Sequence, residues 1–127
     1  MNTRSSIFMV VGATALVLLL GLPLLFFPLA WARASGWKIP EHTDLTNYFG
    51  RSLGGVALAI AILCFQAARD PWGYRGAFDL IIMVGIFMTA VHLYGFVKKS
   101  QPWFESVEVF LYPLVSLLAW IFYPRAG

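Results

Sequence analysis

Four long apolar segments constrain the fold of this chain more than any other feature of its sequence. They cover about residues 7–32, 48–68, 77–97 and 103–123. Each has about the 20 apolar residues that a helix needs to cross the hydrocarbon of a bilayer. None alternates strictly between polar and apolar residues, and lipid offers no hydrogen-bond partners to the edge of an open sheet. The sequence therefore predicts an all-α integral membrane four-helix bundle, with residues 1–127 forming a single transmembrane domain.

The composition excludes a water-soluble domain. Charged residues make up 12% of the chain and hydrophobic residues 60%, whereas a soluble domain is about 25% charged. The nine lysines and arginines stand singly or in pairs, so no basic patch indicates a nucleic-acid partner. A signal peptide is the alternative interpretation of residues 7–32, but this run is about twice as long as the usual apolar core. We therefore expect the lipid bilayer around four crossings, with both termini on the same side of the membrane.

The numbers of cysteines and histidines exclude two classes of membrane redox protein. The chain has one cysteine, Cys64, and a dithiol oxidoreductase needs at least one cysteine pair. The two histidines, His42 and His92, are too few for the pairs of bis-histidine haems in some four-helix membrane cytochromes. We interpret Cys64 as a small packing residue without a redox role.

A stripe of small residues follows one face of the second segment. Its members recur at alternating spacings of four and three: Gly50, Gly54, Ala57, Ala61, Cys64 and Ala68. Membrane helices associate through close backbone approach, which small side chains permit. The stripe therefore predicts a helix-packing seam, either within the bundle or against another subunit. The alternative is that glycine and alanine are simply common in membrane helices.

Ionisable side chains gather near one membrane interface. Arg51, near the start of the second helix, is expected at the level of His92, near the end of the third. Glu105 and Glu108, near the start of the fourth helix, share a helix face because they are three residues apart. One interpretation is a polar pocket in which Arg51 pairs with a glutamate and His92 binds a ligand. The other is an inert salt bridge that locks the bundle, since a buried ion pair alone is weak evidence for function.

Neither a metal site nor a cofactor is predicted from these residues. A dinuclear carboxylate site usually takes about four glutamates and two histidines from four helices, and residues 7–32 contain no ionisable residue. His92 as a ligand to a haem or chlorophyll, or as a contact to a quinone, stays open because one neutral imidazole is enough for axial ligation. An ordinary hydrogen-bonded histidine is the simpler interpretation.

The chain resembles the small four-helix bacterial membrane proteins grouped as DoxX-like and BphX-like. The resemblance depends on size, helix count, the opening of the second helix (residues 48–54, YFGRSLG) and a histidine in the third helix, here His92. It implies the bacterial inner (cytoplasmic) membrane and an association with oxidoreductase or oxygenase systems. It supports the fold far more than any activity.

Three functions compete at this stage. The first is a non-catalytic accessory or assembly subunit of a larger membrane complex, redox or energy-transducing, because the chain has a small-residue seam and no recognisable catalytic constellation. Its partners would be other membrane subunits or further copies of the chain. The alternative is a small oxidoreductase-associated protein that binds a quinone-like or other hydrophobic ligand at the polar layer of Arg51, His92, Glu105 and Glu108. The third is a small transporter, which residues 7–32 disfavour because they lack a carboxylate.

Overall fold

The computed structural model describes residues 3–125, and over that range it is helical and contains no strand. Its elements are α1 (Thr3–Leu16), a π-helical turn η1 (Val17–Gly21), α2 (Leu22–Phe26), α3 (Pro28–Ala34), α4 (Asp44–Arg69), α5 (Arg75–Lys98) and α6 (Trp103–Ile121). Four helical stretches are long and apolar enough to cross a membrane: Thr3–Phe26, α4, α5 and α6. The predicted all-α class and the four spans are therefore confirmed.

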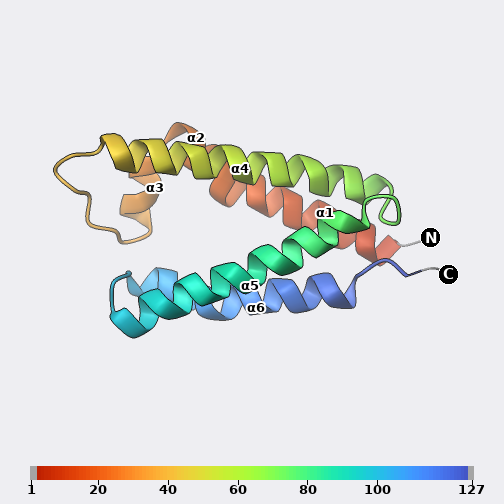
Figure 1. Cartoon of the computed structure of the whole chain (residues 1–127). Helices are drawn as coiled ribbons and strands as arrows, with labels where there is room; N and C mark the ends of the chain where they lie inside the picture. Colours follow the sequence, from red (N-terminus) through yellow and green to blue (C-terminus); the bar gives the residue numbers. More distant parts are fainter. Residues whose placement is uncertain (1–2, 126–127) are drawn as a thin grey trace.

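The four spans are arranged as two antiparallel helix pairs (Figure 1). In the first helix pair, α4 packs along α1, η1 and α2, and in the second helix pair, α5 packs along α6. α4 and α5 are consecutive in the chain, yet they contact each other over a much shorter length than either pair does. The helices of each pair are therefore positioned mainly by each other.

The first apolar segment is not the single helix that residues 7–32 predicted. It changes to a π-helical turn at Val17–Gly21 and breaks at Phe27, whose φ of −134° and ψ of 53° are not helical. The prolines explain this, because Pro23 and Pro28 lack an N–H and their rings crowd the preceding turn. The carbonyl of Leu19, four residues before Pro23, accepts a hydrogen bond from the Trp31 indole at 2.9 Å. α3 therefore folds back beside the segment that it follows.

The small-residue seam is buried inside the first helix pair. A Cβ at Gly50 would lie 2.5 Å from the Pro28 Cβ, and one at Gly54 would clash with the Leu25 backbone nitrogen. Buried residues continue along the same face: Gly54, Ala57, Ala61, Cys64 and Ala67. The last predicted member, Ala68, is only partly buried, because the face continues at a spacing of three to Ala67. The seam thus binds the chain's own first segment.

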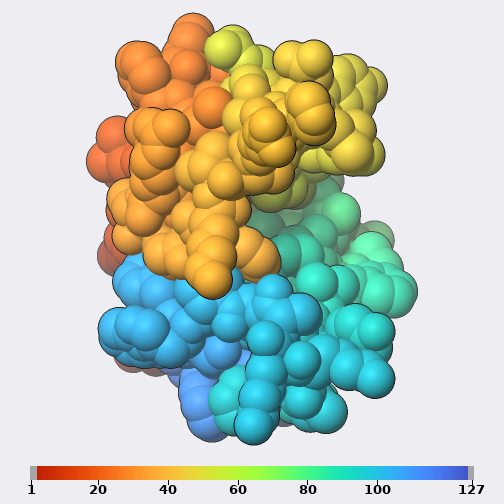
Figure 2. All heavy atoms as spheres, turned by 90° about the vertical axis from the view of Figure 1, so that its left-hand side faces the viewer, coloured from red at the N-terminus to blue at the C-terminus, as the bar shows by residue number. Residues whose placement is uncertain are grey.

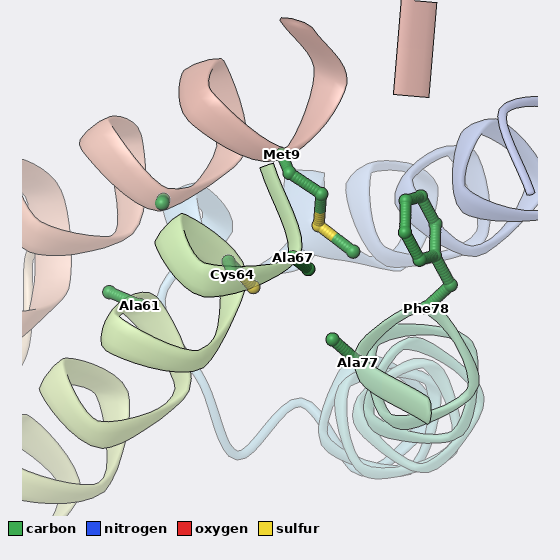
Figure 3. Packing of buried hydrophobic residues seen from close by; sticks show 7 residues of the cluster. Met9, Ala61, Cys64, Ala67, Ala77 and Phe78 are labelled. Carbon is green, nitrogen blue, oxygen red and sulfur yellow. The ribbon is translucent and has the colours of Figure 1, made fainter. Parts of the chain in front are cut away.

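Apolar side chains join the two pairs at the end of the bundle where α1 begins and α6 ends. Met9 of α1, Ala67 of α4 and Phe78 of α5 converge there (Figure 3). The Phe78 ring lies 6.3 Å from that of Phe8 and 5.8 Å from that of Tyr123. Packed aromatic rings of this kind stabilise beyond the area that they bury.

Candidate functional site

Three ionisable side chains meet inside the second helix pair, and we name them the His–Glu–Glu cluster: His92, Glu105 and Glu108. The Nε2 atom of His92 lies 2.9 Å from Oε2 of Glu108 and 3.4 Å from Oε2 of Glu105. One ligand atom from each residue falls within 4.8 Å of the others. His92 and Glu105 are each 6% exposed, and the Glu108 side chain is 16% exposed. His92 and Glu105 are therefore buried and Glu108 is partly buried, although all three groups are ionisable.

The helix geometry explains why these side chains converge. Glu105 and Glu108 lie three residues apart near the start of α6 and so project from the same face. His92 precedes the last turns of α5, which runs antiparallel to α6, so it lies at the level of the two glutamates. The turn between the helices is tight because Lys99 takes a left-handed conformation, with φ of 53°, and the Ser100 N–H bonds the Gly95 carbonyl at 3.0 Å.

The imidazole of His92 is oriented by the backbone of its own helix. Its Nδ1 atom lies 2.8 Å from the carbonyl oxygen of Met88, one turn earlier. A carbonyl oxygen only accepts hydrogen bonds, so Nδ1 carries the proton and donates. In a neutral ring, Nε2 then holds the lone pair and points at the two carboxylates. The fold therefore presents Nε2, and not Nδ1, to the cluster.

Two aromatic side chains hold the outer side of the carboxyl groups. The Trp37 indole N–H donates to Oε1 of Glu105 at 3.1 Å, which leaves Oε2 facing His92. The Tyr112 ring packs 5.0 Å from the His92 ring, and Tyr112 follows Glu108 by four residues on the same face of α6. His92 and Glu105 thus each have a second hydrogen-bond partner that fixes their orientation.

Trp37 reaches the cluster because of the turn that precedes it. Gly36 has φ of +85°, a conformation that residues with a Cβ rarely adopt. A Cβ there would also lie 3.3 Å from the Cβ of Pro102, at the start of α6. The loop after α3 therefore lies directly on the turn between α5 and α6, as the end-on view shows (Figure 2). This contact connects the first helix pair to the cluster.

Arg51 does not belong to the cluster, and the predicted charge pair between Arg51 and a glutamate is wrong. Its Nη1 donates to the Leu25 carbonyl at 3.3 Å, and the side chain is exposed. The break at Phe27 leaves Leu25 in the last turn of α2, where carbonyls lack helical donors. Because α4 packs on that segment, the nearest acceptor for Arg51 is this backbone oxygen. Within residues 3–125, every salt bridge involves His92.

The cluster consequently has no lysine or arginine partner in the part of the chain that the structure describes. Two carboxyl groups face one imidazole, so even an imidazolium would leave one negative charge if both glutamates were ionised. Burying a charge without compensation costs several kcal/mol, on the order of the penalties for buried ions in proteins. The arrangement therefore requires either a bound proton or a bound cation.

Two grooves in the structure lie outside the cluster. One, of about 350 Å³, is mostly apolar and lies between α2, α3 and the start of α4, with Trp37 and Lys38 in its lining. The other, of about 440 Å³, lies at the opposite end, where Arg4 and Arg125 line it. Trp37 stands between the first groove and the cluster, because its ring lines the groove while its N–H bonds Glu105.

Comparisons with known proteins leave the interpretation to the chain's own geometry: no family model, curated protein or solved structure matches it. The resemblance to DoxX-like and BphX-like proteins therefore stays a prediction. Sequence reasoning identified His92, Glu105 and Glu108 but missed Trp37 and Tyr112 as their partners. Tyr112 carried a usable signal, because it follows Glu108 by four residues and shares its helix face. Trp37 carried none, since its position depends on the turn at Gly36.

Proposed function

We propose that this chain is a small integral membrane protein, associated with an oxidoreductase system, that binds a ligand at the His–Glu–Glu cluster. The observation that carries the proposal is the convergence of three ionisable side chains, two buried and one partly buried, without a lysine or arginine partner among residues 3–125. The redox association comes from the resemblance to DoxX-like and BphX-like proteins alone. The cluster lies about 9 Å inside the end of α5, counted from His92 at 1.5 Å per residue.

The chemistry of the cluster favours a small ligand over a large one. Both nitrogens of His92 face oxygen atoms within 3.4 Å, so a macrocycle at Nε2 would have to displace both glutamates. The grooves of about 440 and 350 Å³ described above are not lined by any of the three cluster residues. Nε2 and the two carboxyl groups supply a base, two acids and up to three ligand atoms at one point.

The competing explanation is that the cluster only fastens α5 to α6. Replacing a buried ionic group by an apolar one is often neutral or stabilising, so fastening alone does not require three ionisable residues here. The explanations differ in what they predict for the purified protein. A ligand site retains a molecule or an ion, whereas a structural cluster retains nothing.

An inventory of co-purifying ligands tests the proposal. The wild-type chain, His92→Ala and His42→Ala would be extracted in mild detergent without chelator and surveyed by mass spectrometry and elemental analysis. His42 is the matched control, because it lies exposed in the loop before α4. We expect one species near one equivalent per chain in the wild type and His42→Ala, and its loss in His92→Ala. Retention by His92→Ala, or an empty wild-type protein, would refute a ligand site.

A non-catalytic accessory or assembly subunit is a second proposal, in which a partner would contact the outer faces of the second helix pair that lipid otherwise covers. Phe87 and Phe110, near the middle of α5 and α6, are 70% and 78% exposed. The seam no longer supports this function, because the chain's first segment occupies it. We expect that a Phe87→Ala, Phe110→Ala double variant weakens co-migration with other subunits on native gels of mild-detergent extracts. A wild-type extract that runs only as free monomer would exclude this function.

We further propose the bacterial inner membrane as the location, with both ends of the chain on one side. The end of α6 supports the second point, because the Ser5 hydroxyl of α1 donates to the Phe122 carbonyl at 2.6 Å. Reporter domains fused to either terminus would give signals from the same compartment. Signals from opposite compartments would contradict this topology.

A further inference from the structure

We infer that the ligand of the His–Glu–Glu cluster is a single divalent transition-metal ion. This inference rests on the proposed ligand site and names the class of ligand. The three ligand atoms would be Nε2 of His92 and one carboxylate oxygen each from Glu105 and Glu108. They come from two antiparallel helices and lie within 4.8 Å of one another.

Two of the three separations between the ligand atoms suit one shared ion, and the third, between the two carboxylate oxygens, is at most 4.8 Å. Metal–nitrogen and metal–oxygen bonds to Zn²⁺ are about 2.0–2.2 Å long. Two ligands that subtend an angle between 90° and 110° at such an ion are therefore roughly 2.9–3.5 Å apart. Nε2 of His92 lies 2.9 Å from Glu108 Oε2 and 3.4 Å from Glu105 Oε2. Binding one ion would require the two carboxylate oxygens to lie within the same range of each other, which rotation of the glutamate side chains can provide.

The partners around the three residues have the arrangement of an outer shell. Metal-bound histidines almost always donate their other ring N–H to a carbonyl or carboxylate, which fixes the tautomer. His92 does this through Nδ1 and the Met88 carbonyl at 2.8 Å. Glu105 is held in the same way, because the Trp37 indole donates to Oε1 and the other carboxylate oxygen, Oε2, faces Nε2 of His92. These contacts preorganise a lone pair and a carboxylate oxygen in a shared direction.

A bound cation would satisfy the charge of the cluster without a bound proton. Two carboxylates and a neutral imidazole carry a charge of −2, which one divalent ion would neutralise. The basic side chain nearest in the predicted layer, Arg51, bonds the Leu25 carbonyl instead. A buried ion in this position would replace the missing basic partner and remove the desolvation cost of the carboxylates.

The donor set selects the class of metal. Imidazole suits zinc, iron, nickel and copper, and carboxylates suit manganese and harder ions, so a mixed set favours Mn²⁺, Fe²⁺ or Zn²⁺. Three protein ligands leave at least one coordination position for water or another molecule, as in catalytic sites. A dinuclear site would need about six ligands from four helices, whereas a mononuclear site needs only these three.

Titration with Co²⁺ tests the inference on the whole chain. Protein stripped with chelator in detergent would receive Co²⁺, whose visible absorption reports its coordination, and Zn²⁺ would compete for the site. We expect saturation at one Co²⁺ per chain in the wild type. Glu41→Gln and His42→Ala are the matched controls, because both residues lie exposed in the same loop, and neither should alter binding.

Variants of the ligands give the second arm of the test. Glu105→Gln, Glu108→Gln and His92→Ala should each weaken Co²⁺ binding by more than about 100-fold, beyond the losses typical of outer-shell partners. Trp37→Phe should weaken it by about 10-fold, as an outer-shell partner does. Glu105→Gln keeps the shape of the side chain, so it remains informative if His92→Ala fails to fold.

The outcomes of these experiments distinguish a failure of the metal inference from a failure of the proposed ligand site. The metal inference is overturned if the wild-type protein fails to saturate with Co²⁺ or Zn²⁺. It is also overturned if metal binding survives in all three ligand variants. If an organic molecule is then found in the inventory and lost in His92→Ala, the proposed ligand site stands without a metal. If the inventory is also empty, both proposals fail.

Discussion

The first helix pair and the second helix pair bury different kinds of side chain. Between the first segment and α4, the buried contacts are glycine, alanine and cysteine, and backbones approach closely. Between α5 and α6, the buried contacts include His92 and Glu105, and the Ser116 hydroxyl donates to the Ile82 carbonyl at 3.1 Å. One pair is held by close packing, and the other is held partly by polar groups.

This difference indicates that the first helix pair is a packed scaffold and that the second carries the candidate site. Lipid competes equally for apolar side chains, so packing in the first pair depends on how closely two backbones fit. Ionisable side chains are costly in a bilayer and mark function more often than packing does. The second pair carries all three members of the His–Glu–Glu cluster, while the first contributes Trp37 through the loop after α3. Substitutions in the two pairs should therefore have different consequences.

The largest effect is expected from Gly54→Leu in the first pair. A Cβ at Gly54 would clash with the Leu25 nitrogen and lie 2.9 Å from the Gly21 carbonyl oxygen. Backbone atoms cannot move aside as a side chain can, so overpacking here should exceed its usual cost and reach more than about 4 kcal/mol. Size-exclusion chromatography and thermal unfolding in detergent would measure the loss of folded protein.

Gly55→Leu is the matched control for this prediction. Gly55 is the next residue along α4, and a Cβ there meets no atom within 4 Å. The free energy of unfolding of this variant should lie within about 0.5 kcal/mol of the wild-type value, as is usual for surface substitutions. Equal losses at the two positions would show that the seam does not bind the first segment.

Phe78→Ala is expected to have the next largest effect, because it acts where the two pairs meet. The Phe78 side chain is fully buried among residues of α1 and α4. Truncation of a buried phenylalanine costs about 3 kcal/mol or more. Phe87→Ala, on the exposed face of the same helix, should cost far less. Thermal unfolding of both variants would compare them, and similar losses would contradict the packing between pairs.

Trp37→Phe should have a smaller effect on stability. It removes the hydrogen bond to Glu105 and keeps an aromatic ring in the loop. A hydrogen bond to a charged group contributes about 1.5–3 kcal/mol, and a neutral one about 1 kcal/mol, so we expect a loss of about 1–2 kcal/mol. Trp103→Phe, at the exposed start of α6, is the control for unfolding measurements. A loss of similar size in the control would assign the effect to the tryptophan ring and not to the bond.

The sequence predicted the levels and faces of side chains within the second pair. α5 and α6 begin and end within two residues of the predicted segments. Helical spacing alone placed Glu105 and Glu108 on one face. Because consecutive membrane helices run in opposite directions, the end of α5 and the start of α6 lie on the same side of the membrane, which placed His92 at the depth of the two glutamates. These inferences hold because they depend on properties of one helix or on the order of neighbouring helices.

The sequence did not predict which side chains of the first pair would reach the second. Arg51 was assigned to the polar layer by its level, but its direction depends on the rotation of α4 about its axis. The packing of Gly54 on Leu25 sets that rotation, and a break at Phe27 supplies the carbonyl that Arg51 binds. The spacing of residues along a helix predicts neither the break at Phe27 nor the free carbonyl of Leu25 that results from it.

Arg51→Met is expected to have the smallest effect, and it distinguishes the observed partner from the predicted one. The substitution keeps an apolar stem and removes one exposed hydrogen bond to the Leu25 carbonyl, so it should cost less than about 1 kcal/mol. If Arg51 instead neutralised a buried glutamate, its removal would leave an uncompensated carboxylate and cost about 3–5 kcal/mol. Thermal unfolding measures the first quantity, and Co²⁺ affinity gives an independent measure, because a residue outside the cluster should leave it unchanged. A large loss in both would return Arg51 to the site and connect the two helix pairs through charge, whereas a small loss in both confines the cluster's charge to α5 and α6.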